Sequence, residues 1–279
     1  MTYQEALRYG QIRLTAAGVL EVESDAWLLM SAACRIDRNF YYVYGNEDMR
    51  EEQEKEYMDL LEKRASRIPL QYITGEQEFM GLDFKVNPGV LIPRQDTEIL
   101  VEEALKAITP GMEVLDLCTG SGCIAVSLAK FKPKAKVQGA DISPEALQVS
   151  EENAKRNGVD VRFFLSDMFR QVRGKFDIIV SNPPYIPTGV IQGLMPEVKD
   201  FEPHLALDGR EDGLWFYQIL ASEGKKYLKP GGFLMVEIGC DQGKAVSQLF
   251  QDEGYCDIKV IKDLAGLDRV VTGKDERHV

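Results

Sequence analysis

The chain of 279 residues is long enough to bury a sizeable core and leaves room for two domains. Its composition, with 44% hydrophobic and 28% charged residues, is that of a soluble globular protein, and its net charge of -12 argues against a protein that relies on phosphate contacts. Scattered cysteines and only two histidines, His204 and His278, argue against a metal site or a disulfide scaffold and favour a reducing compartment.

The first quarter of the chain is predicted to be helical. It begins without a signal-peptide pattern, and no apolar run is long enough for a bilayer, so we expect a cytoplasmic protein with no membrane partner. Thr2 is expected to cap a first helix and Ser24 a second, and a third helix from Met49 to Arg67 carries an apolar stripe. We predict a helical domain over residues 1–73, which either recognises a partner or merely covers the main sheet.

Residues 74–93 change to alternating apolar positions separated by glycines and by an Asn87-Pro88 turn signal. This pattern predicts a β-hairpin that links two domains. A helix from Ile99 to Ile108 should follow, with Asp96 or Thr97 as its cap. Arg94 is a candidate for an ion pair or a ligand contact.

Strands alternate with helices through the predicted domain 94–279, which indicates an α/β fold with a mostly parallel sheet. The connection between the last two strands is too short for a crossover helix, so the final strand should be antiparallel. The seven predicted strands are Met112–Leu117, Val137–Ile142, Val161–Leu165, Phe176–Ser181, Phe233–Ile238, Ile258–Ile261 and Arg269–Thr272.

A glycine-rich turn follows the first of these strands. Glycines permit close approach of a ligand to the backbone, and Asp141 at the end of the next strand can accept hydrogen bonds from two ribose hydroxyls. The segment Gly120–Ala125 also fits a dinucleotide pattern, so NAD stays possible on local grounds. Asp116 is a candidate for contact with the ammonium of a methyl donor. Asp167 and Met168 are candidates to flank an adenine ring, and a helix cap is the equal alternative for Asp167.

The fourth strand ends abruptly in Asn182-Pro183-Pro184-Tyr185. The prolines stop the strand and stiffen the turn at the edge where open α/β sheets bind ligands. Asn182 offers an acceptor and a donor, Pro183 a carbonyl group and Tyr185 a flat ring, which suit a planar amide or amino group. The following loop, residues 186–213, is interpreted as a lid, with Glu202 near the site or capping a turn, and His204 at the surface.

Asn182–Tyr185, Asp116–Ile124, Leu91–Glu98 and Glu202–Gly213 together resemble the protein-glutamine N5-methyltransferases that modify peptide chain release factors, the PrmC/HemK family. The resemblance implies a class I fold, S-adenosylmethionine as the methyl donor with S-adenosylhomocysteine as product, and the glutamine of a Gly-Gly-Gln motif as acceptor. It implies a cofactor site made of Gly120, Ser121, Gly122, Cys123, Ile124, Asp141, Met168 and Asn182, with Asn182, Pro183, Pro184 and Tyr185 holding the glutamine. Cys118, Met168 and Gln95-Asp96 depart from common family residues.

We hypothesise that Asn182 and the Pro183 carbonyl accept the two amide N–H bonds, and that Tyr185 packs against the amide plane. No metal is needed, and a monomer is expected. The alternatives are methylation of a ribosomal-protein glutamine or of adenine N6 in nucleic acid, of which the second would ordinarily require a basic face. A NAD-dependent oxidoreductase and a non-catalytic cofactor sensor stay open as different classes of function.

Overall fold

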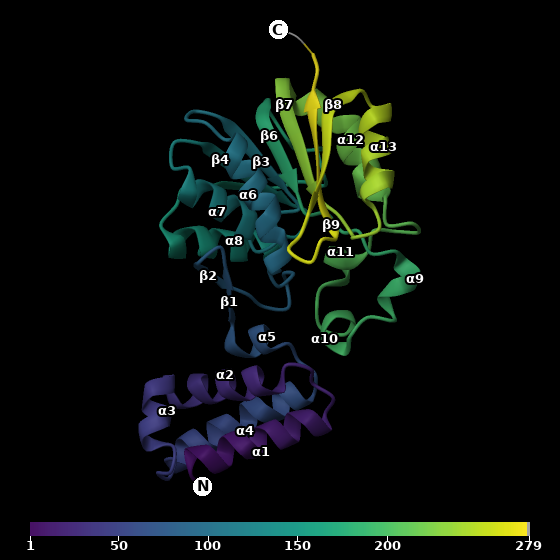
Figure 1. Ribbon diagram of the computed structural model, residues 1–279. Coiled ribbons are helices and arrows are strands. Elements are labelled where there is room, and N and C mark those ends of the chain that lie inside the picture. Colours follow the sequence, from purple (N-terminus) through teal and green to yellow (C-terminus); the bar gives the residue numbers. More distant parts are fainter. Residues whose placement is uncertain (278–279) are drawn as a thin grey trace. The chain divides into compact units, whose positions relative to one another are not determined.

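The computed structural model describes residues 1–277, which form two compact units (Figure 1). The helical unit comprises Met1–Gly75 together with the short segment Met195–Phe201. The sheet unit comprises Glu76–Leu194 and the chain from Glu202 onward. A stretch of the predicted lid therefore packs with the helical unit, although it lies more than a hundred residues away in the sequence.

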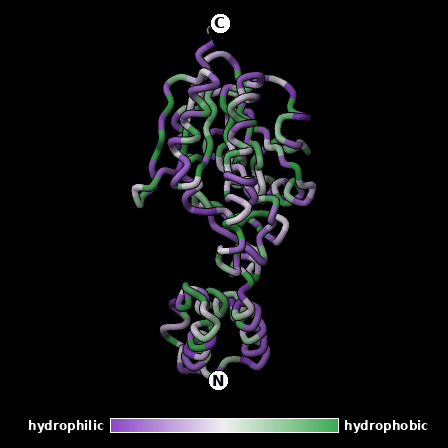
Figure 2. The backbone as a smooth tube through the Cα atoms, turned by 90° about the vertical axis from the view of Figure 1, so that its right-hand side faces the viewer, coloured by the Kyte–Doolittle hydropathy of each residue, from purple (hydrophilic) through white to green (hydrophobic). Residues whose placement is uncertain are grey.

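Amphipathic helices build the helical unit. They are α1 (Tyr3–Ala16), α2 (Val22–Cys34), α3 (Arg38–Tyr44), α4 (Glu51–Ala65), α5 (Leu70–Thr74) and α10 (Pro196–Lys199). Hydrophobic and hydrophilic stretches alternate along the tube near the N-terminus in Figure 2. The apolar faces of α1, α2, α4 and α5 enclose one core, with Leu14, Leu29, Tyr57 and Leu61 fully buried.

Local sequence signals predict one of these helix starts correctly and another incorrectly. Thr2 caps α1 as predicted, in a capping box with Glu5. The prediction for Ser24 is wrong, because α2 begins at Val22 and its N-cap is Glu21, which leaves Ser24 inside the first turn. Close packing also shapes the unit: a Cβ at Gly10 would lie 2.2 Å from the Tyr57 hydroxyl oxygen, so α1 and α4 can approach closely only with glycine there.

The sheet unit begins with the predicted hairpin and continues into a sheet of seven strands in the order β5-β4-β3-β6-β7-β9-β8. The hairpin strands are β1 (Glu76–Phe79) and β2 (Leu82–Lys85), and the sheet strands are β3 (Glu113–Leu117), β4 (Lys136–Asp141), β5 (Arg162–Leu165), β6 (Phe176–Ser181), β7 (Leu228–Glu237), β8 (Tyr255–Lys262) and β9 (Asp268–Asp275). Strand β9 lies between β7 and β8 and is antiparallel to both, which confirms the predicted class I methyltransferase plan.

Helices cover both faces of this sheet (Figure 1). Helices α6 (Glu98–Ala107), α7 (Cys123–Phe131) and α8 (Pro144–Asn157) lie on one face, and α12 (Trp215–Tyr227) and α13 (Gly243–Asp252) on the other. Successive residues of β6 supply both cores, since Ile178 and Val180 join the first cluster and Ile179 the second. The carboxyl ends of the central strands are therefore fixed by packing on both sides.

The segment 186–213 is ordered and contains more structure than a loop. Helices α9 (Thr188–Ile191) and α11 (His204–Leu207) belong to the sheet unit, and α10 belongs to the helical unit. In the sheet unit the segment folds back on itself, because Ile186 N donates to Leu207 O at 3.0 Å and Thr188 N to Arg210 O at 2.8 Å.

Candidate active site

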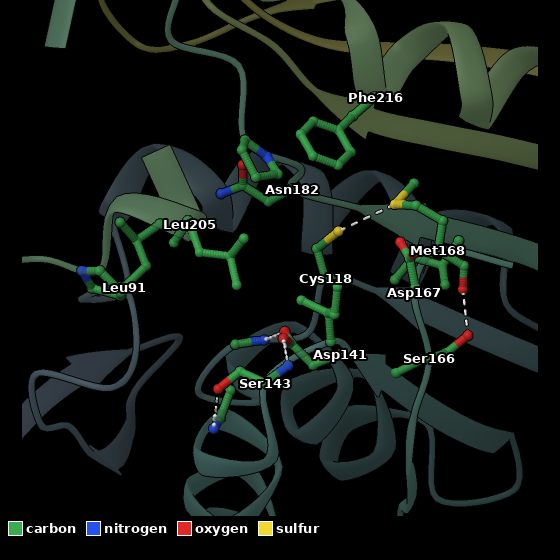
Figure 3. A pocket seen from close by; sticks show the side chains of 18 of the residues that line it. Leu91, Cys118, Asp141, Ser143, Ser166, Asp167, Met168, Asn182, Leu205 and Phe216 are labelled. Carbon is green, nitrogen blue, oxygen red and sulfur yellow. Dashed lines mark hydrogen bonds between the residues drawn. The ribbon is translucent and has the colours of Figure 1, made fainter. Parts of the chain in front are cut away.

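A pocket of about 470 Å³ opens at the carboxyl ends of β3, β4, β5 and β6 (Figure 3). This is the edge at which open α/β sheets bind ligands. The predicted residues Gly120, Asp141, Met168, Asn182 and Pro184 line it. The other lining residues come mainly from the segment after the hairpin, the loop after β4, α11 and α12, and include Pro88, Leu91, Ser143, Leu205, Phe216 and Ile219.

Of the predicted cofactor residues Gly120 to Ile124, the pocket wall contains Gly120. Gly120 has φ +56° and open space where a Cβ would stand, so its backbone is accessible to a ligand. Ser121, Cys123 and Ile124 are buried beneath it. Gly122, at φ +79°, is needed for packing, because a Cβ there would lie 2.8 Å from the Ser150 Cβ. Within the described chain, these four residues support the loop rather than line the pocket.

The expectation that Asp116 meets a ligand ammonium is wrong. The side chain is fully buried and lies outside the pocket wall. Strand alternation turns it toward α7, where its Oδ2 accepts hydrogen bonds from Thr119 Oγ1 at 2.6 Å and from the backbone N of Ala125 at 3.2 Å. Burial raises the pKa of Asp116 to about 7. Asp116 therefore holds the glycine loop onto the start of α7.

Asp141 stands at the end of β4 with its carboxylate at the pocket. Its Oδ2 accepts from Gly120 N at 2.8 Å and its Oδ1 from Ser143 N at 2.9 Å. Burial raises the pKa of Asp141, while these amides counteract the shift. Each oxygen keeps a further lone pair, so the fixed carboxylate can accept two more hydrogen bonds from a polyhydroxyl ligand.

Sulfur and an aromatic ring form the pocket's apolar end. Met168 Sδ lies 3.9 Å from Cys118 Sγ, and Phe216 of α12 points into the same pocket (Figure 3). Cys118 and Met168 both have positive φ, 60° and 47°, a conformation that favours glycine. Phe216 was not predicted from the sequence. It supplies a flat surface where Met168 replaces an aromatic residue frequent in the resembling family.

A hydrogen bond to a neighbouring element orients the Asn182 amide. Asn182 Nδ2 donates to Thr97 Oγ1 at 3.2 Å, which leaves Oδ1 as the acceptor at the pocket. Thr97 was predicted only as a possible helix cap. It holds the N-cap position of α6 without a side-chain cap bond, and its buried hydroxyl serves Asn182 instead.

The Tyr185 end of the turn is held by residues outside the pocket wall. Pro183 and Tyr185 do not line it, so their contact with a substrate amide stays a prediction. Tyr185 directs its hydroxyl to Glu237 Oε1 at 3.4 Å, and its carbonyl accepts from Gln242 Nε2 at 3.0 Å. Gly213 also packs on this carbonyl, since a Cβ there would lie 2.3 Å from the oxygen.

An ion pair joins the segment before α6 to the segment before α11. Arg94 Nη2 lies 2.5 Å from Glu202 Oε1, so the sequence expectation of an ion pair for Arg94 is met, with Glu202 as its partner. The Glu202 side chain is 1% exposed, and burial raises its pKa while Arg94 opposes the shift. His204 lies at the surface as predicted, with 60% of its side chain exposed.

Within residues 1–277, no three His, Cys, Asp or Glu side chains gather in a way that could hold a metal ion. His278 lies outside the described residues. None of the helices described is both long and apolar enough to cross a bilayer.

Comparison with family models gives two matches. Residues 5–75 match the PrmC N-terminal domain, and residues 85–194 match the methyltransferase small domain. The first match falls on the helical unit. The second spans the glycine loop and the Asn182–Tyr185 turn.

Two relatives that match over nearly the whole of both chains share one name. The chain is 45% identical to a release factor glutamine methyltransferase of Geobacter sulfurreducens, over 98% of this chain and 96% of that protein. It is 44% identical to the protein of the same name from Moorella thermoacetica, over 96% of this chain and 97% of that one. A solved methyltransferase structure from Pyrococcus furiosus, 23% identical, covers 71% of this chain and 91% of its own with a TM-score of 0.54, which indicates the fold alone.

Proposed function

The chain belongs to the release factor glutamine methyltransferases, and on this basis we propose that it transfers a methyl group from S-adenosylmethionine to the side-chain amide nitrogen of a glutamine in a peptide chain release factor. The observation that carries the proposal is the fixed amide of Asn182. Its acceptor oxygen is left for a ligand at the mouth of a pocket that also contains Asp141 and Gly120.

The pocket fits the proposed methyl donor on its own geometry. The absence of a Cβ at Gly120 leaves free space next to its backbone, which a side chain would partly fill. The Asp141 carboxylate is positioned to bind ribose hydroxyls. Met168, Phe216 and Ile219 offer an apolar end for a base. When bound, S-adenosylmethionine supplies an electrophilic methyl group on a sulfonium. We assign Gly120, Asp141, Met168, Phe216 and Asn182 to its site.

An amide nitrogen is a weak nucleophile because its lone pair is delocalised into the carbonyl group. Asn182 Oδ1 and the Pro183 carbonyl are proposed to accept the two N–H bonds of the substrate glutamine. These acceptors would fix the nitrogen in one orientation and stabilise the positive charge that develops on it. Tyr185, held by Glu237 and Gln242, is proposed to keep the turn in this position. The prolines leave the turn little freedom to relax.

The helical unit is proposed to recognise the release factor. The match to the PrmC N-terminal domain supports this assignment, as does the location of the predicted site residues, which all lie in the sheet unit. A monomer acting in the cytoplasm is the simplest form of the proposal.

Incubation with a radiolabelled methyl donor, a release factor, ribosomal proteins and DNA tests the proposed acceptor. We expect label in the release factor. Label confined to ribosomal protein or to DNA would overturn the assignment of the substrate.

A further inference from the structure

A buried carboxylate, which holds the Tyr185 hydroxyl, lies directly beside the catalytic turn. Glu237 ends β7, the strand next to β6, and it is 1% exposed. Ser181 and Val236 are paired in the register of these strands, so Asn182 and Glu237 are each the next residue along. The strand pairing thus places a carboxylate behind the turn that is proposed to hold the substrate amide.

Glu237 has few partners for a buried carboxylate. Oε1 accepts from the Tyr185 hydroxyl, and among the described residues Oε2 has no hydrogen-bond partner. The Thr97 hydroxyl approaches the carboxyl group closely enough to lower its pKa, and Arg269 acts on it through charge. Burying a carboxylate is costly unless it is bound, and an amide or apolar residue would cost less here. Its position next to Thr97 and Tyr185 therefore suggests a function.

Donor and acceptor counting links Glu237 to Asn182. Thr97 Oγ1 accepts from Asn182 Nδ2, so the single hydroxyl hydrogen of Thr97 must be directed elsewhere. An ionised carboxylate can only accept hydrogen bonds, so it draws that hydrogen toward itself. Thr97 is then obliged to act as an acceptor toward Asn182. If the direction were reversed, Asn182 would present its NH₂ group to the substrate, and two donors would face each other.

We propose that Glu237, acting through Thr97, is a positioning residue that sets the amide orientation of Asn182, so that Oδ1 faces the substrate amide nitrogen. This inference rests on the proposed function and adds two residues to it. The Tyr185 hydroxyl is a second link, because it holds the other end of the turn to the same carboxylate. Thr97 and Glu237 touch neither methyl donor nor acceptor in this scheme.

Paired variants test the relay in the full-length enzyme with a release factor as substrate. Thr97→Val removes the hydroxyl at nearly constant volume, and Thr97→Ser restores it. Glu237→Gln replaces an acceptor-only group with one that also donates. We expect Thr97→Val and Glu237→Gln to lower kcat about 10- to 100-fold, with KM for the release factor and the dissociation constant for S-adenosylmethionine within about twofold. Thr97→Ser should keep kcat within about threefold of the wild type.

Asp275→Asn is the matched control, because Asp275 is another fully buried carboxylate of the sheet, whose partners are Arg277 and Lys225 rather than the turn. It should lower thermal stability and leave kcat unchanged. Wild-type kcat in Thr97→Val, or equal losses in Thr97→Val and Thr97→Ser, would overturn the relay. If the wild type itself does not methylate the release factor, the proposed function fails instead, so the two failures are distinguishable.

Discussion

The side-chain amide of Asn182 and the hydroxyl of Thr97 form a hydrogen bond of 3.2 Å between the end of β6 and the start of α6. Residues 85 positions apart thereby decide which atom of Asn182 faces the pocket. A flexible loop asparagine could present either atom. Here the orientation is set before any substrate arrives, which is the condition for efficient electrostatic stabilisation.

Asn182 is expected to matter for turnover far more than for cofactor affinity. Asn182→Ala removes an acceptor that is used most strongly when charge develops on the substrate nitrogen, so kcat should fall by about 100-fold or more. Asn182→Asp keeps the shape but removes the donor to Thr97, so it should also be impaired. Calorimetry with S-adenosylmethionine should show affinities within a few-fold of the wild type. Undiminished methylation by Asn182→Ala would contradict the mechanism.

We predict that turnover depends on pH through the ionisation of Glu237. Burial raises its pKa to about 7, while the nearby Thr97 and Tyr185 hydroxyls and the charge of Arg269 oppose the shift. The relay requires the ionised form, so kcat of the wild type should fall as the pH drops from 8 to 6, with a midpoint near pH 7. Charged or titratable groups that face Glu237 are Arg269, Asp96, Tyr185 and Tyr217.

Asp116 also has a pKa of about 7, so a pH profile alone does not identify the group. The decisive comparison is with Glu237→Gln, in which the step near pH 7 should disappear from the remaining activity. Stability should respond in the opposite sense. A raised pKa in the folded state stabilises the fold below the unfolded pKa and loses that contribution as the pH rises through the folded value. Glu237→Gln should therefore gain stability relative to the wild type between pH 5 and pH 8, measured by urea unfolding.

Glu197 is predicted to hold the segment Met195–Phe201 in the helical unit. Its carboxylate lies 2.5 Å from Arg67 Nη2 and 3.0 Å from Arg64 Nη2, and Arg64 also contacts Asp25 at 2.7 Å. Arg64, Asp25 and Glu197 are largely buried, so Glu197→Ala leaves Arg64 and Arg67 with Asp25 as the one carboxylate of the cluster and should cost about 3–5 kcal/mol.

The fluorescence of Trp27 reports on urea unfolding of this unit once Trp215 is replaced by Phe, since the chain has two tryptophans. Glu62→Ala is the matched control, because it breaks the exposed pair with Arg13 and should leave the urea midpoint nearly unchanged. Equal midpoints for Glu197→Ala and Glu62→Ala would show that the buried cluster does not stabilise the unit.

Alanine variants of Gly122 and Gly158 distinguish the cost of backbone strain from the cost of overpacking in the sheet unit. Both have positive φ, but a Cβ at Gly158 meets no atom within 4 Å, whereas one at Gly122 would lie 2.8 Å from the Ser150 Cβ. Gly158→Ala should cost about 1–2 kcal/mol from the left-handed conformation alone. Gly122→Ala should cost about 1–3 kcal/mol more from overpacking, and should weaken binding of the methyl donor by shifting Gly120. Equal unfolding free energies for the two variants would contradict the packing account.

Patterns local in sequence predicted much of the fold. Periodicity and turn residues indicated the hairpin, the order of strands and helices and the antiparallel final strand, because each depends on neighbouring residues. The turn at Asn182 was evident from its prolines. Asp116 was misplaced because its polar side chain suggested a ligand contact, whereas strand alternation directs it at α7, on the side opposite Leu115 and Leu117.

The partners of the site come from distant parts of the chain. Phe216 looks like any apolar residue of an amphipathic helix, and no local pattern assigns it to the pocket. Thr97 and Glu237 gain their significance only when β6, β7 and the start of α6 are brought together. The docking of Glu197 onto Arg64 and Arg67 likewise spans more than a hundred residues. Such contacts depend on the packed tertiary structure, which single-sequence patterns do not encode.

We propose that this enzyme methylates the side-chain amide nitrogen of a release-factor glutamine held by Asn182. The most direct test is mass-spectrometric mapping of a release factor after incubation with S-adenosylmethionine and either wild-type enzyme or Asn182→Ala. We predict a single methyl group on the amide nitrogen of the Gly-Gly-Gln glutamine with the wild type, and almost none with Asn182→Ala. A methyl group on another residue, or equal methylation by both enzymes, would contradict the account.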